Sequence, residues 1–339
     1  MKKYRKRRPT MTEVAKLAGV SQTTVSFVIN GNSDIPNETK ERIMDAISEL
    51  GYRPNRAAQI LRTDHSGIIG FVTDEIAITP YAGKIFEGAQ DVAWAQNKIL
   101  LLVNTKNDPR LEVAAINMLQ DQRVEGIIYA AMYHRRVTPP DLLWEIPSVL
   151  LDCYVADRSL PAVFPDEVGA GYQATSILLD QGHKRIGFMN SNNNASAGTA
   201  GRLKGYQDAL AAYGIPYDDA LVCIDVPFAE GGYRCTKLLM QRPNPPTALF
   251  CYCDRMAMGA YDALRNLKVS IPEDVAVMGF DNQEIIAAHL YPPLSTMELP
   301  HYEMGKWATQ FLLEHINHDG DIHPVQNAQA CSYIKRLSV

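Results

Sequence analysis

The sequence has no long hydrophobic run and no recognisable secretory leader. No stretch approaches the roughly 18 consecutive apolar residues that suggest a membrane-spanning helix. Six positive charges fall within the first eight residues, MKKYRKRR, but no apolar run follows them as a secretory signal requires. These absences predict a cytoplasmic protein without a membrane partner.

The signatures of common catalytic and metal sites are also missing. No GxxxxGK[ST], HExxH or GxSxG sequence is present. Residues 169–174, GAGYQA, match a relaxed dinucleotide-binding fingerprint, but no acidic residue follows about twenty residues later to hold a ribose. His315, His318 and His323 lie close together, yet a solvated surface is the more ordinary explanation. We therefore expect no enzyme activity, no cofactor and no metal.

The six cysteines show no zinc-binding or redox spacing. They lack a CxxC pair and lie mostly in apolar runs. Cys251 and Cys253 flank Tyr252 on an expected strand, so both would point to one face, which is a poor start for a zinc site. We expect all six to be reduced thiols in the core.

Charge is distributed unevenly along the 339 residues. Residues 1–62 contain twelve Lys and Arg against six Asp and Glu, a net charge of +6, whereas the remainder has 21 against 32, a net charge of −11. A basic head on an acidic body suits a protein whose head alone contacts DNA phosphates, because the body would be repelled.

Residues 10–30 show the pattern of two short helices joined by a tight turn. Thr10 and Glu13 form a Thr-x-x-Glu capping box ahead of an apolar face, and Gly19 is suited to end that helix. Ser21 then caps a second helix. This spacing is typical of a helix-turn-helix, whose second helix enters the major groove of DNA.

The outer face of the second helix has residues suited to reading bases. Val25, Val28 and Ile29 face inward, which leaves a polar side and an exposed phenylalanine. Glutamine can pair with adenine, and a threonine methyl can pack on thymine. Simple solvation of this face is the alternative. The candidate DNA-contacting residues of the head are Thr10, Ser21, Gln22, Thr23, Ser26, Phe27 and Asn30.

A third helix over residues 36–50 would complete a small core before Gly51. Residues 52–62 then form a linker with helical propensity that is too short to be stable alone, so it should become ordered only against a partner.

From Gly67 onward, short apolar runs alternate with helical patterns, which indicates two successive doubly wound α/β units with a cleft between them. The expected strands are 68–72, 99–103, 126–130, 148–151, 162–164, 185–189, 221–224, 248–252 and 275–280. The expected helices are 84–97, 111–120, 168–179, 202–213, 232–240 and 255–267.

Four aspartates follow expected strands, where a cleft would lie. Carboxylates accept hydrogen bonds from sugar hydroxyls, and an arginine can orient the same diol. Aromatic side chains in nearby loops could stack on a sugar ring or simply pack. Asp254 could equally cap the helix that follows it. The candidate effector-binding residues are Asp74, Tyr81, Asp152, Arg202, Phe228, Asp254 and Asp281.

The stretches VAKLAGVSQTTVSFVIN and ETKERIMDAISELGYRPNRAAQIL closely resemble the DNA-binding head and hinge of the lac repressor/galactose repressor (LacI/GalR) family. The resemblance covers essentially the whole chain. It implies a homodimer on palindromic double-stranded operator DNA and a sugar effector. It also implies a hinge that folds on the operator, with Leu61 wedged into the minor groove. The hinge candidates are Asn55, Arg56, Ala58 and Leu61.

The resemblance also assigns effector contacts and exposes two departures. Residues matching the family's effector site are Asp74, Asp152, Arg202, Phe228 and Asp281. Phe27 stands where many members have an arginine that contacts guanine, so we expect thymine-methyl packing there. Cys253 replaces an asparagine commonly found before Asp254, which puts one hydroxyl contact in doubt. We therefore rank Asp152, Arg202 and Asp281 above Cys253 as effector contacts.

The sequence thus predicts an α/β protein with a three-helix helix-turn-helix head, a hinge helix, and a periplasmic-binding-protein-like core of two doubly wound α/β subdomains. The head spans residues 1–53, the hinge 54–65 and the core 66–339. The core divides roughly into 66–161 with 292–323, and 162–291 with 324–339.

The function predicted from these features is sugar-responsive transcriptional repression. Stretches such as IPEDVAVMGFDN and YPPLSTMELPH resemble sucrose-operon repressors, so a sucrose-type sugar is the first expectation. Two alternatives are a regulator of the same fold that answers to a purine or another corepressor, and a sugar-binding or sugar-processing protein without a DNA role. The lack of a terminal heptad repeat favours a dimer over a tetramer.

Overall fold

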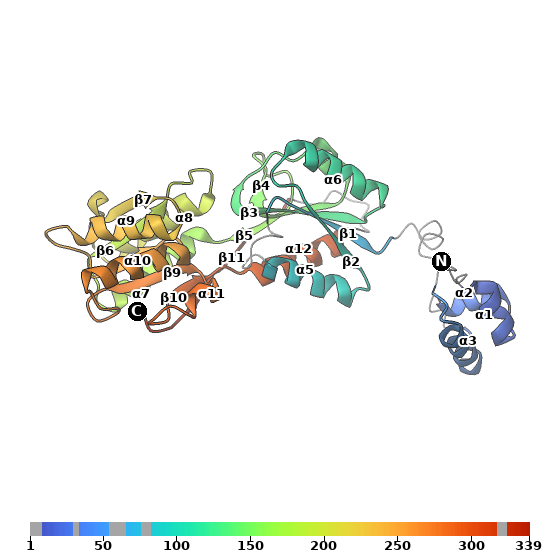
Figure 1. Cartoon of the computed structure of the whole chain (residues 1–339). Helices are drawn as coiled ribbons and strands as arrows, with labels where there is room; N and C mark the ends of the chain where they lie inside the picture. The colour runs from blue at the N-terminus through green and yellow to red at the C-terminus, as the bar shows by residue number, and fades with distance from the viewer. Residues whose placement is uncertain (1–8, 30–33, 54–65, 76–82, 317–323) are drawn as a thin grey trace, which may run out of the picture. The chain divides into compact units, whose positions relative to one another are not determined.

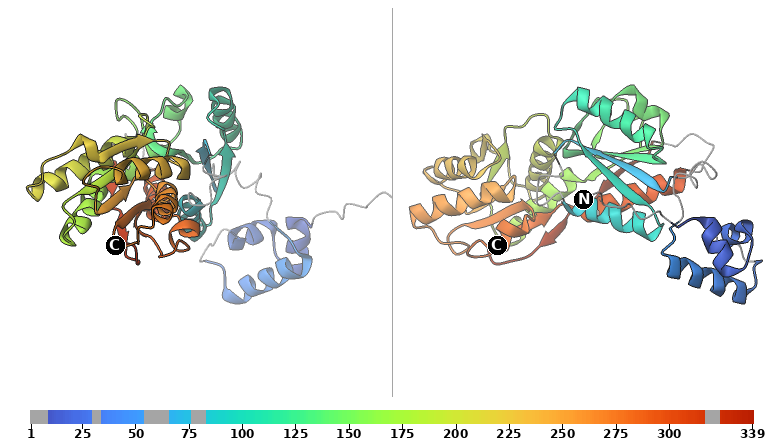
Figure 2. Two further views of the ribbon diagram at one scale, coloured as in Figure 1. Left: turned by 60° about the vertical axis from the view of Figure 1, so that its left-hand side comes forward. Right: turned by 45° about the vertical axis from the view of Figure 1, so that its right-hand side comes forward.

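A computed structural model describes residues 9–29, 34–53, 66–75, 83–316 and 324–339. The chain divides into two compact units, residues 1–66 and 67–339. The first unit contains three helices: α1 (Met11–Ala18), α2 (Gln22–Ile29) and α3 (Asn37–Leu50). They pack around a small apolar core in which Val14, Val25 and Ile43 are fully buried (Figure 2).

The expected helix signals of the head are confirmed. The capping box of Thr10 and Glu13 is formed in both directions, and Gly19 ends α1 in the left-handed conformation. Gly51 ends α3 in the same way. The Ser21 hydroxyl accepts a hydrogen bond from the Thr24 amide at 3.1 Å, which caps α2.

The second unit contains two six-stranded sheets, each flanked by helices on both faces (Figure 1). The first sheet has the order β11-β5-β4-β3-β1-β2, and the second β12-β10-β9-β8-β6-β7. All paired strands are parallel except β10 and β12. The N-terminal subdomain is the first sheet with α5, α6 and α12, and the C-terminal subdomain is the second sheet with α7 to α11.

The bounds of the N-terminal subdomain are β1 Ile68–Thr73, α5 Gly83–Ala95, β2 Ile99–Asn104, α6 Pro109–Asp121, β3 Gly126–Arg136, β4 Ser148–Tyr154, β5 Ala162–Pro165, α12 His301–His315 and β11 Gln326–Gln329. Those of the C-terminal subdomain are α7 Glu167–Asp180, β6 Ile186–Ser191, α8 Ala197–Ala212, β7 Val222–Asp225, α9 Ala229–Met240, β8 Ala248–Cys251, α10 Asp254–Leu267, β9 Ala276–Asp281, α11 Glu284–Ala287, β10 Ser295–Glu298 and β12 Ser332–Ile334.

The expected fold class and all nine expected strands are confirmed, but the division of the core is corrected. Strands β5 and β11 pair with each other in the first sheet, whereas β10 belongs to the second. The chain therefore changes subdomain at other residues than expected. The unexpected strands β10 and β11 gave no sequence signal because backbone pairing, not an apolar run, defines them.

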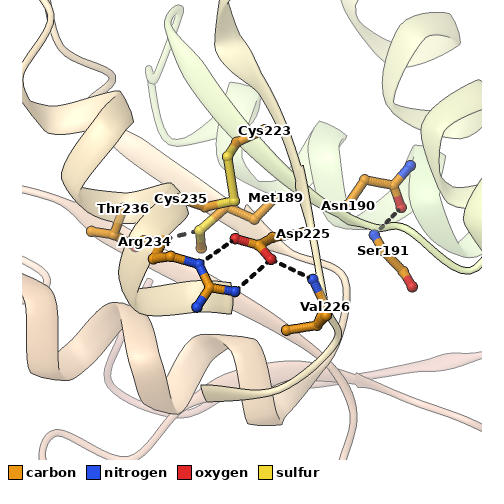
Figure 3. The surroundings of a disulfide bond; sticks show 9 residues. All are labelled: Met189, Asn190, Ser191, Cys223, Asp225, Val226, Arg234, Cys235 and Thr236. Carbon is orange, nitrogen blue, oxygen red and sulfur yellow. Dashed lines mark hydrogen bonds and ion pairs between the residues drawn. A yellow bond between two sulfur atoms is a disulfide. The ribbon is translucent and has the colours of Figure 1, made fainter. Parts of the chain in front are cut away.

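The expectation of six reduced cysteines is wrong for two of them. Cys223 of β7 and Cys235 of α9 form a disulfide, with Cα atoms 5.5 Å apart (Figure 3). The neighbouring Arg234 binds Asp225 through two hydrogen bonds, so α9 is attached to β7 by covalent and ionic contacts. Sequence spacing could not reveal the pair, because only the packing of α9 beside β7 brings the sulfurs together.

Close helix crossings shape the C-terminal subdomain. A Cβ atom added to Gly205 of α8 would lie 2.2 Å from the Val168 carbonyl oxygen of α7. One added to Gly171 of α7 would lie 2.6 Å from the Arg202 carbonyl oxygen. The fingerprint GAGYQA therefore lies inside a helix, and Gly171 serves helix packing. This crossing brings Glu167 beside Arg202.

Replacing Gly205 by alanine should destabilise the protein by about 1–3 kcal/mol or more, because the added methyl group meets rigid backbone atoms. Chemical denaturation with and without the substitution measures this difference. Gly83, at the start of α5, has open space around the position of a Cβ atom. Gly83→Ala should therefore be neutral or slightly stabilising, and equal effects of the two substitutions would contradict the tight crossing.

Candidate effector cavity and DNA-reading helix

A cavity lies where the two subdomains meet, beside the carboxyl ends of their parallel strands. It encloses about 600 Å³ of empty space out to its mouth, within the range of small-molecule sites. Its polar lining comes from both subdomains. The polar residues that line it include His134, Asp152, Glu167, Ser191, Asn193, Ser196, Arg202, Tyr252, Arg255, Asp281 and His301.

Arg202 of α8 is the most heavily bonded group of this lining. Its Nε donates to Glu167 Oε2 at 2.7 Å, and its Nη2 donates to Glu167 Oε1 at 3.3 Å. Its Nη1 donates to the Tyr252 carbonyl oxygen and lies 3.6 Å from Asp281 Oδ1. The guanidinium carbon is also 3.6 Å from the centre of the Phe280 ring. The positive charge of Arg202 is thus neutralised within the protein.

Asp152, two residues before the end of β4, and Asp281, the last residue of β9, occupy strained backbone positions. Their φ angles are 55° and 101°, in the region that favours glycine. Oδ1 of Asp152 has no hydrogen-bond partner among the described residues. Burial raises the pKa of Asp152 well above its ordinary value, with Glu167 adding to the shift. Burial also raises the pKa of Asp281 to about 6, opposed by Arg202. Strain of this kind is often found at functional sites.

His134 lies in the last part of β3, beyond the span expected from the sequence. Its ring is stacked on Phe164, with centroids 4.6 Å apart and planes at 16°, and meets Tyr154 edge-on. Burial lowers the pKa of His134 to about 4, so the imidazole is neutral at pH 7. Neither ring nitrogen has a hydrogen-bond partner among the described residues.

Three of the expected effector residues, Asp152, Arg202 and Asp281, line the cavity together. The residues Asp74, Phe228 and Asp254 do not line it. Asp74 is bound by Arg135 at 2.8 Å, and Phe228 is exposed. The seventh, Tyr81, lies outside the described residues.

Asp254 is buried away from the cavity lining and has structural partners. Its Oδ2 accepts from the Gln283 amide at 2.6 Å, and its Oδ1 accepts from the Thr296 hydroxyl at 2.7 Å. Asp254 thereby joins the start of α10 to β10 and to the loop after β9. Both oxygens thus have protein partners, and the expected contact of Asp254 with effector stays a prediction that the structure does not favour.

Glu167 and His134 are among the cavity residues that the sequence analysis missed. Glu167 lies two residues after the end of β5. A search for polar residues just after expected strands could therefore have found it. His134 had no such signal, because the apolar run of β3 ends near Ala130 whereas the strand continues to Arg136.

In the head, the outer face of α2 is available as expected. Gln22, Thr23 and Phe27 are exposed, and Phe27 keeps 46% of its surface. Gln22 donates to the Thr12 hydroxyl, and Ser21 is engaged in capping. Thr10 is likewise bound to Glu13, and Ser26 is half-buried. The remaining DNA candidates, Asn30, Asn55, Arg56, Ala58 and Leu61, lie outside the described residues.

The architecture defines a class of protein: a helix-turn-helix head joined to a two-subdomain ligand-binding core. Comparison with protein families agrees in both parts. Residues 10–55 match the model "Bacterial regulatory proteins, lacI family", and residues 66–336 match "Periplasmic binding proteins and sugar binding domain of LacI family". The chain belongs to the LacI family, and it is a DNA-binding repressor of that family.

Characterised relatives are transcriptional regulators. The ribose operon repressor of Haemophilus influenzae is 30% identical over 92% of this chain and 93% of its own length. The HTH-type transcriptional repressor PurR of Haemophilus influenzae is 32% identical over 91% of each chain. The expected likeness to sucrose-operon repressors stays a prediction, because neither of these relatives is named for sucrose.

Solved structures share the fold over nearly the whole chain. A complex of the transcriptional regulator CelR with cellobiose is 28% identical, has a TM-score of 0.69, and is matched over 98% of this chain and 100% of its own. The Lac repressor dimer bound to operator and the anti-inducer ONPF has a TM-score of 0.78 at 24% identity, and the match covers 98% of this chain and 99% of its own.

Within the described residues, no helix is long and apolar enough to cross a membrane.

Removing the Arg202 side chain should cost about 3–5 kcal/mol of stability, because Glu167 would remain buried without its cation. Arg202→Met combined with Glu167→Gln should recover most of this loss. Urea denaturation of the single and double variants measures both effects. Lys204→Met, which breaks the exposed pair of Lys204 and Asp208 on the same helix, should cost less than about 1 kcal/mol. A double variant no more stable than Arg202→Met would argue against a coupled pair.

Proposed function

We propose that this repressor binds a palindromic operator as a homodimer and is released from it by a sugar held in the cavity between its subdomains. The observation that carries this proposal is the polar cavity itself, where Asp152 and Asp281 flank the fixed guanidinium of Arg202. Carboxylates at the ends of strands accept hydrogen bonds from hydroxyl groups, which suits a sugar.

The comparisons support a sugar ligand without identifying it. One relative is a ribose operon repressor, and one solved structure with the same fold is a complex with cellobiose. A sucrose-type sugar remains our first candidate, on the residue stretches noted in the sequence. Asp152, Arg202 and Asp281 are the proposed contacts of the ligand.

An unpaired edge of the first sheet supports a homodimer. Among the described residues, β2 pairs only with β1, which leaves its other edge open. The exposed side chains there include Ile99, Leu101 and Leu102, and Trp94 at the end of α5 is also exposed. Exposed apolar edges promote association unless something covers them. A second copy of the chain would bury this edge, as a two-fold operator requires.

Release by a sugar requires that the ligand bind two arrangements of the core with different affinity. The cavity meets this requirement in principle, because its walls belong to different subdomains. The two subdomains also contact each other directly. Lys84 of α5 binds Glu298 of β10 at 3.1 Å, and a backbone bridge joins Arg135 to Ser196. A ligand that changes the angle between the subdomains would alter these contacts and, through the hinge, DNA binding.

A corepressor is the second candidate, and the similarity to the repressor PurR favours it. It differs from the sugar proposal in sign, since ligand would then strengthen operator binding. The other alternative, a sugar-binding protein without a DNA role, is weakened by the match of residues 10–55 to the DNA-binding head of the family.

A sugar inducer should lower operator affinity at least about tenfold, which corresponds to roughly 1.4 kcal/mol of coupling. Full-length protein would first select its site from random duplex DNA. The selected palindrome would then be titrated at physiological ionic strength with and without sucrose, cellobiose or ribose. Tighter binding with a ligand, including a purine base, would reverse the sign to corepression. No preference for any site would contradict the proposal as a whole.

Replacing Phe27 by alanine should weaken specific operator binding by about tenfold, on the order of 1.4 kcal/mol, because its exposed ring would lose contact with thymine methyls. Stability should change by less than about 0.5 kcal/mol, since the side chain is exposed and is not part of the apolar core of the head. Met44 of α3, which is 55% exposed, provides the matched control. Met44→Ala should leave operator affinity unchanged, and an equal effect of both substitutions would remove the reading role of Phe27.

A further inference from the structure

The two walls of the cavity differ in how well their polar groups are satisfied. On the C-terminal subdomain, Arg202 and Glu167 bind each other, and Oδ2 of Asp281 accepts from Gln283 at 2.9 Å. On the N-terminal subdomain, His134 and Asp152 retain polar atoms without any partner among the described residues. Buried polar atoms in native proteins are usually paired with protein, water or ligand.

The backbone brings these two unsatisfied residues to one place. The register of β3 against β4 shifts between Ala130 and Arg135, after which Arg135 pairs with Cys153. His134 and Asp152 therefore each immediately precede that matched pair. Irregularities of this kind re-aim side chains and are frequent beside functional sites. The left-handed backbone of Asp152 stands at the same level of the sheet.

The ring of His134 is held firmly by its neighbours. Phe164 stacks on it and Tyr154 contacts it edge-on. Arg158 in turn lies 3.7 Å from the centre of the Tyr154 ring and 5.8 Å from that of Phe164. These contacts are made by the carbon framework and the π-system of the imidazole. They hold the ring in place without satisfying its nitrogens.

We propose that His134 is an effector-binding residue whose ring nitrogens exchange hydrogen bonds with hydroxyl groups of an uncharged polyol, beside Asp152 on the same sheet. This proposal rests on the sugar response proposed above and adds a contact residue and a charge class to it. A neutral imidazole offers one donor and one acceptor, which matches a hydroxyl group that both donates and accepts.

The charges around the cavity favour an uncharged ligand over a sugar phosphate. Arg202 is the central cation, and three of its five N–H donors are already used by Glu167 and Tyr252. Arg255 also lines the cavity, with its guanidinium carbon 4.7 Å from the centre of the Phe228 ring. Against these cations the lining has three carboxylates: Asp152, Glu167 and Asp281. A phosphate would meet these acidic groups, while the charge of the main cation is already balanced by Glu167 and Asp281.

The protein should tolerate the loss of the His134 nitrogens. Removing a buried polar group that has no partner is neutral or stabilising when an apolar group of similar shape replaces it. Phenylalanine keeps an aromatic ring against Phe164 and Tyr154. In the His134→Phe variant, stability should therefore stay the same or rise while ligand affinity falls. A purely structural role of His134 would not produce this combination.

The test compares His134→Phe with wild-type protein in full length. Calorimetric titration with sucrose, and in parallel with cellobiose and ribose, should show at least tenfold weaker binding of the responsive sugar to the variant. The melting temperature without ligand should stay the same or rise, and operator affinity without ligand should not change. His134→Gln, which restores one donor and one acceptor, should recover part of the affinity. His289→Phe, at an exposed histidine, is the matched control and should bind sugar as wild type does.

The outcomes separate this inference from the proposed function. If wild type responds to a sugar and His134→Phe responds equally, the role of His134 is overturned while the sugar response stands. If wild type binds none of the sugars, both proposals fail. Sucrose and sucrose 6-phosphate test the charge class, and tighter binding of the phosphorylated sugar would overturn it. Between pH 6 and 8 the contribution of His134 to affinity should be constant, because burial lowers the pKa of His134 to about 4, with Glu167 opposing this shift and Arg158 adding to it.

Discussion

The buried pair of Arg202 and Glu167 is the contact on which the ligand-binding core depends. It exists because α7 and α8 cross closely enough for glycine to be required on both helices. Taking both charges out of water is costly, and attraction within the pair offsets that cost only with further partners. The Tyr252 carbonyl, the Asp281 carboxylate and the Phe280 ring are those partners. Helix packing thereby fixes one wall of the cavity before any ligand arrives.

The opposite wall is built on another principle. Among the described residues, the N-terminal sheet has no comparable ion pair at the cavity, but it has a register shift in β3 and a left-handed residue, Asp152, in β4. Both are local departures from regular strand geometry, and both bring polar groups to the same level. One wall is thus rigid and electrostatically saturated, whereas the other carries strain and unsatisfied hydrogen-bonding capacity.

The sequence was informative wherever the signal was local. Capping residues, glycine ends and apolar runs predicted the head and nine strands. The rule that ligands bind beyond strand ends led to Asp152 and Asp281, and the family resemblance supported Arg202 beside them. The sequence failed where the determinant is tertiary. His134 depends on a register shift, and the disulfide depends on α9 lying beside β7. Asp254 follows a strand as the others do, yet Thr296 and Gln283, distant in sequence, occupy both its oxygens.

This difference between the walls bears on how a ligand could control DNA binding. A ligand shifts an equilibrium only by the difference between its interaction energies in the two states. Groups bound to each other within one subdomain, as Arg202 and Glu167 are, keep those contacts whatever the angle between the subdomains. Contacts made to His134 and Asp152 by a ligand seated on Arg202 would exist only when the subdomains are correctly spaced. The discriminating energy should therefore come from the unsatisfied wall, while the saturated wall positions the ligand.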